Sequence, residues 1–444
     1  MEFSLEQQHA FNKYQEGQNI FLTGPGGSGK SALIKHIFAD AVKQGKKIQV
    51  CALTGCAAVL LECKAKTIHS WAGIGKGLGG NVIDKVKRNK YARTAWKEIE
   101  VLILDEVSMM SKHLFELLDA VGKVVRRCSR PFGGIQLIFS GDFYQLPPVG
   151  QKELPDTCAF CFESTLWFIT FAMENHVQLL KMFRQTDPLY ISILTQIRQG
   201  RIKRSTNEFL MAHVGKSIEL ETSVKPTKLF PMKYQVEEVN QKEMNALENV
   251  ETIYYEIKDS IDLTMNSSEK VLRLQFTKDQ IKAELSHMRN VIPCGSEPVK
   301  LKLGAQVMCI VNIVLEEMND TLCNGAQGIV IGFSKNDLKL PIVRYTNGYV
   351  MTMEYNTWKS ENIPGIGVSQ IPLILAWAIT IHKSQGTTLE VAEIDAGSGI
   401  FECGQTYVAL SRVKTLSGLY LSSFDISRVK INKKVQDFYS IISL

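Results

Sequence analysis

The sequence has no hydrophobic run long enough to cross a membrane. Its longest strongly apolar stretch, residues 371–381, falls well short of the roughly 18–20 residues that a spanning helix needs. The N-terminal residues, with Glu2 and Glu6, also lack the cationic region and the apolar stretch of a secretion signal. We therefore expect no membrane partner and no secretion.

The features of a disulfide-stapled or disordered chain are also missing. The 32 Gly and 13 Pro residues are at ordinary levels for 444 residues, and the ten cysteines show no regular spacing. Cys158 and Cys161 form the one CxxC pair, but no second pair stands at zinc-site spacing from it. Cysteines in apolar surroundings suit a reducing compartment, so we expect an intracellular protein of a bacterial or virus-infected cytoplasm, or of a nucleus or mitochondrion.

The excess of basic over acidic residues, 51 against 45, is too small to indicate an anionic partner by itself. The charge is concentrated in residues 84–97, where Tyr91 and Trp96 are interleaved with cations. This stretch is either a solvated helix face or a surface that meets phosphates and bases. The cations of this basic cluster are Lys85, Lys87, Arg88, Lys90, Arg93 and Lys97.

Short apolar runs alternate with longer amphipathic segments over roughly the first 180 residues. Because strands buried on both faces are continuously apolar, this pattern predicts a parallel sheet in an α/β domain. The predicted strands are residues 19–23, 48–53, 101–104 and 137–139. The main predicted helices are residues 31–44 and 112–127.

The pattern changes in the second half of the chain. A strand is predicted at residues 227–230 between helical segments, whereas residues 250–370 contain short β-rich pieces with turn signals at Asn324-Gly325 and Asn347-Gly348. We therefore expect a β module inserted into a second α/β domain that resumes at Gln370.

The segment GPGGSGKS matches the phosphate-binding pattern GxxxxGK[ST] between a predicted strand and a predicted helix. Backbone N–H groups of such a loop surround phosphate oxygens, Lys30 balances their charge, and the Ser31 hydroxyl can bind Mg²⁺. The dinucleotide pattern GxGxxG also fits, but the next strand ends without an acid for a ribose. A triphosphate is favoured, bound by Gly24, Pro25, Gly26, Gly27, Ser28, Gly29, Lys30 and Ser31.

Two further predicted strands end in polar residues. Asp105 and Glu106 follow residues 101–104, and we expect Asp105 to hold Mg²⁺ through water and Glu106 to activate the attacking water, two solvated acids being the alternative. The NKxD pattern of small GTPases is absent. In GDFYQLPPV, residues 141–149, Gln145 would lie next to the γ-phosphate unless the segment is only a structural turn.

In this order the motifs resemble those of superfamily 1 helicases. Residues 108–149 resemble the signature segment of the PIF-type (petite integration frequency) branch, which is superfamily 1B and RecD-like. FSLEQ (3–7) is similar to the adenine-recognising Q motif of that family, and LTGCAA (53–58) and TIHSWAGIG (67–75) to its first DNA-contacting motifs. The later matches are FRQTD (183–187), LKLGAQVM (301–308), AWAITIHKSQGTTL (376–389) and GQTYVALSR (404–412).

The resemblance implies an α/β fold with two RecA-like (P-loop NTPase) motor domains built on parallel sheets, small inserted subdomains, and one SH3-like β module. The basic cluster would then lie in the strand-separating subdomain. The implied domains are residues 1–60 and 99–180 (first motor domain), 61–98 (strand-separating subdomain), 181–250 and 370–444 (second motor domain), and 251–369 (SH3-like module).

The resemblance also implies roles for single residues. Arg184 and Arg412 match two arginines that reach the γ-phosphate, although either could be an ordinary salt-bridged arginine. Gln7, Gln385 and Gly386 match nucleotide-contacting positions. The implied catalytic residues are Lys30, Asp105, Glu106, Gln145, Arg184 and Arg412. The implied DNA-contacting residues are Thr54, Gly55, His69, Ser70, Pro147, Thr380, His382, Lys383 and Ser384, with a core histidine as the other interpretation of His382.

The function implied is an ATP- and Mg²⁺-dependent DNA helicase that moves 5′ to 3′ on single-stranded DNA and unwinds duplexes, in replication, repair, recombination or telomere and genome maintenance. The polarity comes from the resemblance alone. The expected partners are single-stranded DNA and forked or 5′-tailed duplexes, and we expect a monomer without DNA that can dimerise on it. The alternative is an ATP-driven single-strand translocase that displaces proteins with little unwinding.

Overall fold

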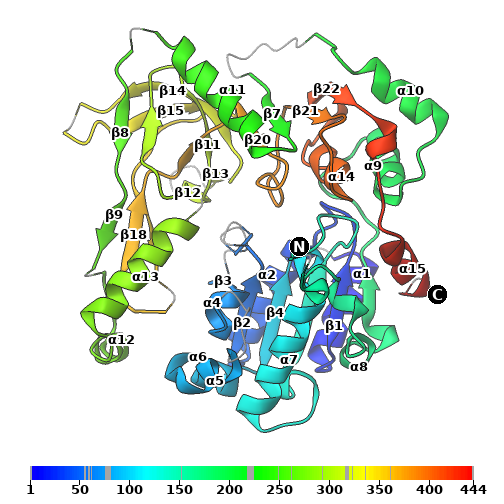
Figure 1. The fold of residues 1–444 in the computed structure, drawn as a ribbon, viewed down its shortest axis with the longest axis vertical. Helices are drawn as coiled ribbons and strands as arrows, with labels where there is room; N and C mark the ends of the chain where they lie inside the picture. Colours follow the sequence, from blue (N-terminus) through cyan, green and yellow to red (C-terminus); the bar gives the residue numbers. More distant parts are fainter. Residues whose placement is uncertain are drawn as a thin grey trace. The chain divides into compact units, whose positions relative to one another are not determined.

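The computed structural model of the protein divides into two compact units (Figure 1). The first unit is Met1–Phe209, Ile400–Ser411 and Asp425–Leu444, and the second is Leu210–Gly399 and Arg412–Phe424. In none of the described residues is there a helix with the length and apolar character to span a membrane. The described residues are 3–54, 57–58, 61, 63–75, 82–151, 153–217, 225–248, 250–261, 263–292, 294–315, 320–322, 324–335, 337–360 and 362–442.

The first unit is built on a six-stranded sheet in the order β3-β2-β4-β5-β1-β6. Every neighbouring pair is parallel, so all carboxyl ends lie at one edge. The four strands predicted for this region are confirmed, within about two residues at each end. The strands are β1 (Ile20–Thr23), β2 (Ile48–Ala52), β3 (Lys66–Thr67), β4 (Val101–Asp105), β5 (Gln136–Gly141) and β6 (His176–Gln178).

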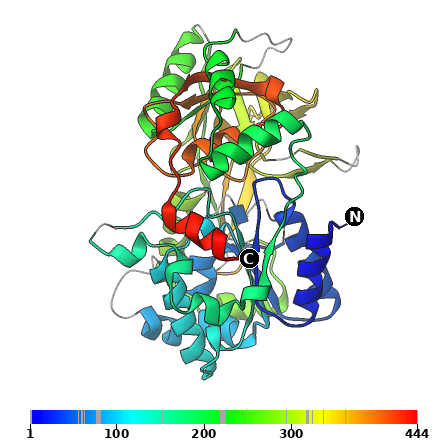
Figure 2. The ribbon, with the colours of Figure 1, turned by 90° about the vertical axis from the view of Figure 1, so that its right-hand side faces the viewer.

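Helices cover both faces of this sheet, which explains why its strands are continuously apolar. Phe21 and Leu102 face a core that includes α5, α6 and α7, whereas Ile20 and Ile103 face a core with α1 and α2. Figure 2 shows the C-terminal helix α15, in red, against this unit. The helices are α1 (Leu5–Gln15), α2 (Lys30–Lys43), α4 (Ile68–Ala72), α5 (Val82–Arg88), α6 (Lys90–Glu98), α7 (Lys112–Arg126), α8 (Trp167–Thr170), α9 (Pro188–Gln199), α14 (Gln405–Leu410) and α15 (Lys433–Ile442).

The two compact units do not coincide with the predicted domains. Residues 61–98 belong to the first unit, because β3 pairs with β2 and the side chains of Val86 and Trp96 are buried in the core of this unit. Residues 181–209 also belong to it: on α9, the Tyr190 hydroxyl donates to the Leu410 carbonyl at the end of α14. The predicted boundaries concern domains that would move relative to each other during ATP turnover, and they remain a prediction.

The second unit contains a parallel sheet in the order β20-β7-β21-β22. The strand predicted at residues 227–230 is confirmed as β7 (Thr227–Phe230), and α11 (Lys233–Ala246) follows it. The apolar run of residues 371–381 forms two short strands rather than a helix, β19 (Leu373–Leu375) and β20 (Ala378–Thr380). The remaining strands of the parallel sheet are β21 (Ala392–Ala396) and β22 (Leu419–Phe424).

The expected β-rich region is present in this unit. Its largest sheet is antiparallel, β16-β15-β14-β11-β19, and the turn signal at Asn347-Gly348 joins β15 to β16 with Gly348 at φ +88°. The strands are β8 (Ile253–Tyr255), β9 (Lys258–Ser260), β10 (Val299–Leu301), β11 (Gln306–Cys309), β12 (Ile313–Leu315), β13 (Asp320–Leu322), β14 (Gln327–Phe333), β15 (Pro341–Tyr345), β16 (Val350–Thr352), β17 (Asn356–Lys359) and β18 (Gly367–Gln370). The other helices are α10 (Arg204–Ala212), α12 (Ser267–Arg273) and α13 (Lys278–Val291).

Candidate nucleotide and DNA site

The segment GPGGSGKS connects β1 to α2, as its pattern predicts. Three of its glycines have positive φ: Gly24 at +145° and Gly27 and Gly29 at +84°. A Cβ atom at Gly24 would lie 2.5 Å from the Leu179 carbonyl oxygen, and one at Gly27 would lie 2.5 Å from Cβ of Arg184. The loop therefore needs glycine both for its backbone shape and for its close packing.

Lys30 begins α2, and its side chain folds back over the loop. Its Nζ donates to the carbonyl oxygens of Gly24, at 2.7 Å, and Pro25, at 3.0 Å. Burial lowers the pKa of the Lys30 ammonium, and the carboxylates of Asp142, Glu106 and Asp105 act in the opposite direction. The cation is thus held inside the loop, close to three acidic side chains.

Asp105 and Glu106 stand at the carboxyl end of β4, as predicted. Asp105 is 6% exposed, and burial together with the neighbouring Glu106 charge raises its pKa, while the charge of Lys30 lowers it. Glu106 has φ +57°, a left-handed conformation that is uncommon for a residue with a side chain. The backbone therefore turns sharply at the residue expected to face the attacking water.

The donor set of this edge fits Mg²⁺, which prefers oxygen ligands. The Asp105 carboxylate lies close enough to Lys30 to interact with its charge, and Ser31 follows Lys30 in the first turn of α2. The Ser28 hydroxyl is buried and has no hydrogen-bond partner among the described residues. A buried hydroxyl in this position is suited to a phosphate oxygen, since polar groups in protein interiors are normally paired.

Two other predicted motifs pack directly on the loop. The Phe183 backbone N–H donates to the Gly27 carbonyl at 2.8 Å, which places Arg184 beside the loop, and Arg184 Nη1 donates to the Ser411 carbonyl at 3.1 Å. Gln7 donates from Nε2 to the Gly29 carbonyl at 3.3 Å and forms a capping box with Ser4 at the start of α1. The adenine contact expected of Gln7 remains a prediction.

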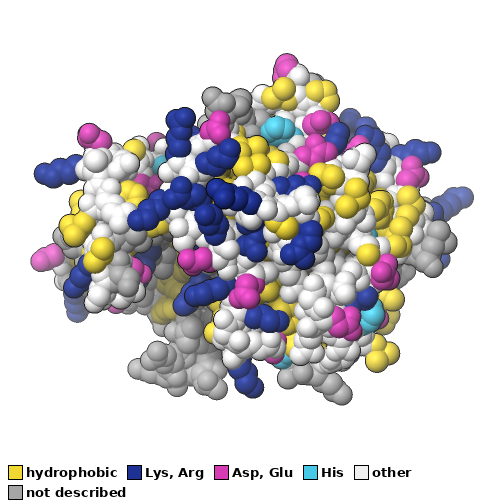
Figure 3. Space-filling view, turned by 90° about the horizontal axis from the view of Figure 1, so that it is seen from below, with side chains coloured by type: hydrophobic (Ala, Val, Ile, Leu, Met, Phe, Trp, Pro, Cys, Tyr) yellow, Lys and Arg dark blue, Asp and Glu magenta, His cyan; other side chains and the backbone are white. Residues whose placement is uncertain are grey.

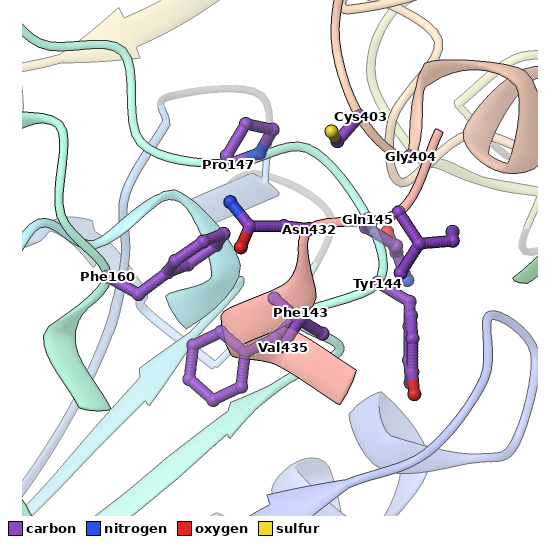
Figure 4. A pocket seen from close by; sticks show the side chains of 10 residues that line it. Phe143, Tyr144, Gln145, Pro147, Phe160, Cys403, Gly404, Asn432 and Val435 are labelled. Carbon is purple, nitrogen blue, oxygen red and sulfur yellow. The ribbon is translucent and has the colours of Figure 1, made fainter. Parts of the chain in front are cut away.

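Gln145 lies in the loop after β5. Its side chain is buried and lines a small cavity, together with Pro147 from the same loop and with residues of the C-terminal segment, among them Cys403, Gly404 and Asn432 (Figure 4). A Cβ atom at Gly404 would lie 2.5 Å from the Gln145 carbonyl oxygen, so the two segments pack tightly. The contact of Gln145 with a γ-phosphate remains a prediction.

The other predicted nucleotide contacts belong to the second unit. Arg412 is 2% exposed, and its Nη1 donates to the Thr387 carbonyl at 3.4 Å. Gln385 and Gly386 lie in the turns after β20, and Gly386 has φ +83°. The structure thus brings the loop, Gln7, Asp105, Glu106 and Arg184 together in the first unit. The roles of Arg412, Gln385 and Gly386 remain predictions.

The predicted DNA contacts are divided between the two units. In the first unit, Thr54 accepts a hydrogen bond from the Ala57 N–H, and His69 and Ser70 lie on α4, where burial lowers the pKa of His69. Pro147 is half-buried in this unit, and Gly55 lies outside the described residues. A channel across both units remains a prediction.

In the second unit, the last residue of β20 and the segment after it supply four of the predicted DNA contacts. Thr380 Oγ1 accepts from the Lys383 N–H, and His382 is half-buried. The Ser384 hydroxyl is buried and donates to the Ile381 carbonyl at 2.8 Å, so it serves the local fold. Lys383 is the exposed member of these four residues.

The basic cluster lies on α5 and α6. Its six Lys and Arg side chains are exposed, whereas Trp96 and Val86 on the same helices are buried in the core. Figure 3 shows Lys and Arg side chains gathered on the face seen from below, the side on which α5 and α6 are drawn in Figure 1. The apolar residues therefore fix the helices, and the cations remain available to solvent or to an anionic partner.

Sequence reasoning assigned no role to Asp142, although it lies inside GDFYQ. Asp142 is fully buried and accepts two hydrogen bonds from Arg198, from Nε at 2.9 Å and Nη2 at 2.7 Å. The tyrosines Tyr407 and Tyr439 were also missed, and each contacts the phosphate loop or the strand before it. Tyr407 lies inside the motif GQTYVALSR, which drew attention only to Arg412, and Tyr439 lies in none of the predicted motifs. The partners of both hydroxyls are hundreds of residues away in the chain.

Comparison with known proteins agrees with this geometry. The model of the family "PIF1-like helicase" matches residues 2–208, and that of "DNA helicase Pif1, 2B domain" matches residues 294–333. The chain is 36% identical to the ATP-dependent DNA helicase PIF1 of Danio rerio over 98% of its own length and 63% of the relative's. It thus spans just under two thirds of that curated relative.

Solved structures give the same result over nearly whole chains. A Bacteroides sp Pif1 in complex with ADP-AlF4 is 30% identical, with a TM-score of 0.78, covering 100% of this chain and 97% of that one. A structure of two coordinating Pif1 helicases that unwind DNA at forked dsDNA is 30% identical, with a TM-score of 0.67, covering 100% and 98%. These Pif1 structures support the α/β architecture with two RecA-like domains. The chain belongs to the PIF1-like helicase family.

Proposed function

We propose that this chain is an ATP-dependent DNA helicase that moves 5′ to 3′ on single-stranded DNA and separates duplex strands ahead of it. The observation that carries the proposal is the assembly at one sheet edge. There a glycine-rich loop holds Lys30, the carboxylates of Asp105 and Glu106 lie close to its charge, and Arg184 packs beside the loop. This combination serves hydrolysis of a triphosphate rather than its storage.

Each of these residues has a distinct task in the proposed reaction. The loop N–H groups and the Lys30 ammonium would bind the phosphate oxygens, and Arg184 would stabilise the charge that develops on the transferred group. Glu106 would orient a water molecule and accept its proton. Ser31 and Asp105 would hold Mg²⁺, which balances phosphate charge when bound.

DNA would contact both units through residues that suit a sugar-phosphate backbone. Thr54 and His69 lie in the first unit, and Thr380, His382 and Lys383 lie in the second. Arg412, also in the second unit, would contact the γ-phosphate of ATP. Binding and hydrolysis of ATP would then change the affinity for DNA. Support comes from the relative that acts on forked dsDNA as two coordinating molecules. We propose that this chain also acts on forked DNA. It would be a monomer without DNA and would form a dimer on the fork.

The remaining parts of the proposal concern the cell. A role in replication, repair, recombination or telomere maintenance follows from a helicase that acts on forks. The intracellular compartment predicted from the cysteine pattern is part of the same proposal. Residues 61–98 would contain the strand-separating element, which the exposed cations of α5 and α6 support.

Unwinding of matched duplexes tests the function. A duplex with a 5′ single-stranded tail and one with a 3′ tail of the same sequence are incubated with the protein, Mg²⁺ and ATP. We expect strand separation of the 5′-tailed duplex only. Preference for the 3′ tail contradicts the polarity. Displacement of streptavidin from a biotinylated strand without strand separation indicates the protein-displacing translocase instead.

A further inference from the structure

Two tyrosine hydroxyls from the C-terminal part of the chain contact the beginning of the phosphate loop. The Tyr439 hydroxyl on α15 lies 2.6 Å from Oγ1 of Thr23, the last residue of β1, and accepts a hydrogen bond from the Phe143 N–H at 3.2 Å. The Tyr407 hydroxyl on α14 accepts a hydrogen bond from the Gly26 N–H, inside the loop, at 2.9 Å. All five residues belong to the first unit.

The side chains of α15 are part of the core of the first unit. Val435 and Phe438 are 1% and 3% exposed and share that core with Phe21 of β1 and Phe143. The ring centroids of Phe438 and Phe21 are 6.0 Å apart, and those of Phe438 and Phe143 are 5.4 Å apart. Because this packing fixes the helix, the Tyr439 hydroxyl reaches Thr23 from a rigid support.

A buried ion pair holds Tyr439 in place. The Tyr439 ring stacks on Tyr144 with centroids 4.7 Å apart and an angle of 14° between the planes. The Arg198 guanidinium lies 4.4 Å from the Tyr144 centroid and 5.3 Å from the Tyr439 centroid, and it binds Asp142. The Tyr439 hydroxyl is 3.3 Å from Oδ1 of Asp142. Asp142, Arg198 and Tyr144 thus together restrict the position of the Tyr439 side chain.

We propose that Tyr407 and Tyr439 are positioning residues that hold the phosphate loop in the shape that binds ATP. Near the other end of the loop, Gln7 Nε2 donates a hydrogen bond to the Gly29 carbonyl. The tyrosines and Gln7 therefore hold the loop at both ends. Without an acceptor for the Gly26 N–H, the loop would be freer before ATP binds, and ATP would have to offset the cost of ordering it. The proposal rests on the ATP site proposed above.

The test uses the full chain with Tyr407→Phe, Tyr439→Phe and the double substitution. Each change removes one hydroxyl and leaves the ring. The matched control is Tyr255→Phe in the second unit, where a similarly buried hydroxyl donates to the Lys339 carbonyl. Binding of a fluorescent ATP analogue gives Kd, ATP hydrolysis with an oligo(dT) strand gives KM and kcat, and thermal unfolding gives Tm.

We expect each single variant to raise Kd and KM for ATP by about three- to tenfold, the effect of one neutral hydrogen bond. We expect kcat to fall less than about twofold and DNA affinity without nucleotide to stay unchanged, since the tyrosines act on loop shape and not on the reacting atoms. The Tyr255→Phe control should leave Kd and KM for ATP as they are.

Three results would overturn the proposal. Unchanged Kd and KM in both variants, with a lowered Tm, would mean that the tyrosines serve only the fold. A fall in kcat at constant KM would place them in hydrolysis, and tighter ATP binding would mean that Tyr407 competes with phosphate for the Gly26 N–H. If Tyr439→Phe does not fold, Thr23→Val removes the same hydrogen bond from the other side. A wild-type chain that binds ATP without hydrolysing it contradicts the proposed function but still allows the Kd comparison.

Discussion

The two parallel sheets of this protein have the same kind of architecture, but only the first carries a phosphate-binding loop. In the first unit, three strands end at Thr23, Asp105 and Gly141, and each end leads into a nucleotide motif. In the second unit, β20 ends at Thr380 and leads into a segment for which DNA contacts and the nucleotide contacts of Gln385 and Gly386 are predicted, and the pattern GxxxxGK[ST] occurs only once in the sequence. The residues that follow the strand ends therefore decide what each sheet can bind.

The largest expected effect comes from removing the central cation of the first unit. We expect Lys30→Ala to reduce DNA-stimulated ATP hydrolysis by about 10³-fold or more and to abolish unwinding, because the charge opposite the phosphates is removed. DNA affinity without nucleotide should survive. The control, Lys43→Ala, changes an exposed lysine at the end of the same helix, α2. Appreciable ATPase activity in the folded Lys30→Ala protein would contradict the role of Lys30 in balancing the phosphate charge.

The next effect separates binding from hydrolysis within the first unit. We expect Glu106→Gln to lower turnover by about 10²-fold while ATP affinity stays the same, because the amide cannot accept the proton of the attacking water. Steady-state kinetics and nucleotide binding check this, with Glu98→Gln at the end of α6 as the control. If affinity collapses together with turnover, Glu106 serves the metal or the fold instead.

A smaller effect tests whether the first unit also handles duplex DNA. Replacing Lys85, Lys87, Arg88, Lys90 and Arg93 by Ala should reduce fork unwinding several-fold and leave ATPase activity on single strands nearly unchanged. The log–log salt dependence of fork binding should flatten by roughly 0.9 for each duplex phosphate that the protein no longer neutralises. A charge-matched control replaces five exposed lysines on helices of the second unit, Lys233, Lys242, Lys270, Lys278 and Lys282. If unwinding and ATPase activity fall in proportion, the basic cluster holds the single strand or supports the fold. If neither activity changes, the cluster is only a solvated helix face.

The smallest effect concerns the second sheet. Lys383→Ala removes the exposed cation after β20, and we expect a loss of a few-fold in affinity for oligo(dT) and a salt slope smaller by roughly 0.7, the value for one neutralised phosphate of a single strand. ATP affinity without DNA should not change. Lys339→Ala, an exposed lysine of the same unit that pairs with Glu251, is the control. An equal loss of oligo(dT) affinity in both variants would mean that Lys383 does not contact DNA.

Much of the fold could be predicted because the decisive signals are local. The strands of the first sheet are apolar on both faces, and the glycines of the phosphate loop occur at fixed spacing. The grouping of residues 181–209 with the first unit could not be predicted, because it depends on contacts such as that of α9 with α14. Such pairings leave no periodic pattern in the sequence.

The same distinction applies to the candidate site. Lys30, Asp105 and Arg184 stand in motifs whose order predicts their meeting, and the structure places them together. Tyr407 and Tyr439 are separated from Gly26 and Thr23 by 381 and 416 positions. Only the folded chain shows which tyrosine hydroxyls reach the loop.

The core of the first unit includes α15, which follows the whole second unit in the chain, and this has a consequence for biosynthesis. A nascent chain on the ribosome will contain the phosphate loop and most of the first sheet long before Phe438 and Tyr439 are made. The apolar surface that these side chains cover, around Phe21 and Phe143, therefore stays open until Phe438 is added, 438 − 143 = 295 positions after Phe143. The first unit can reach its final packing only after the second unit has been synthesised.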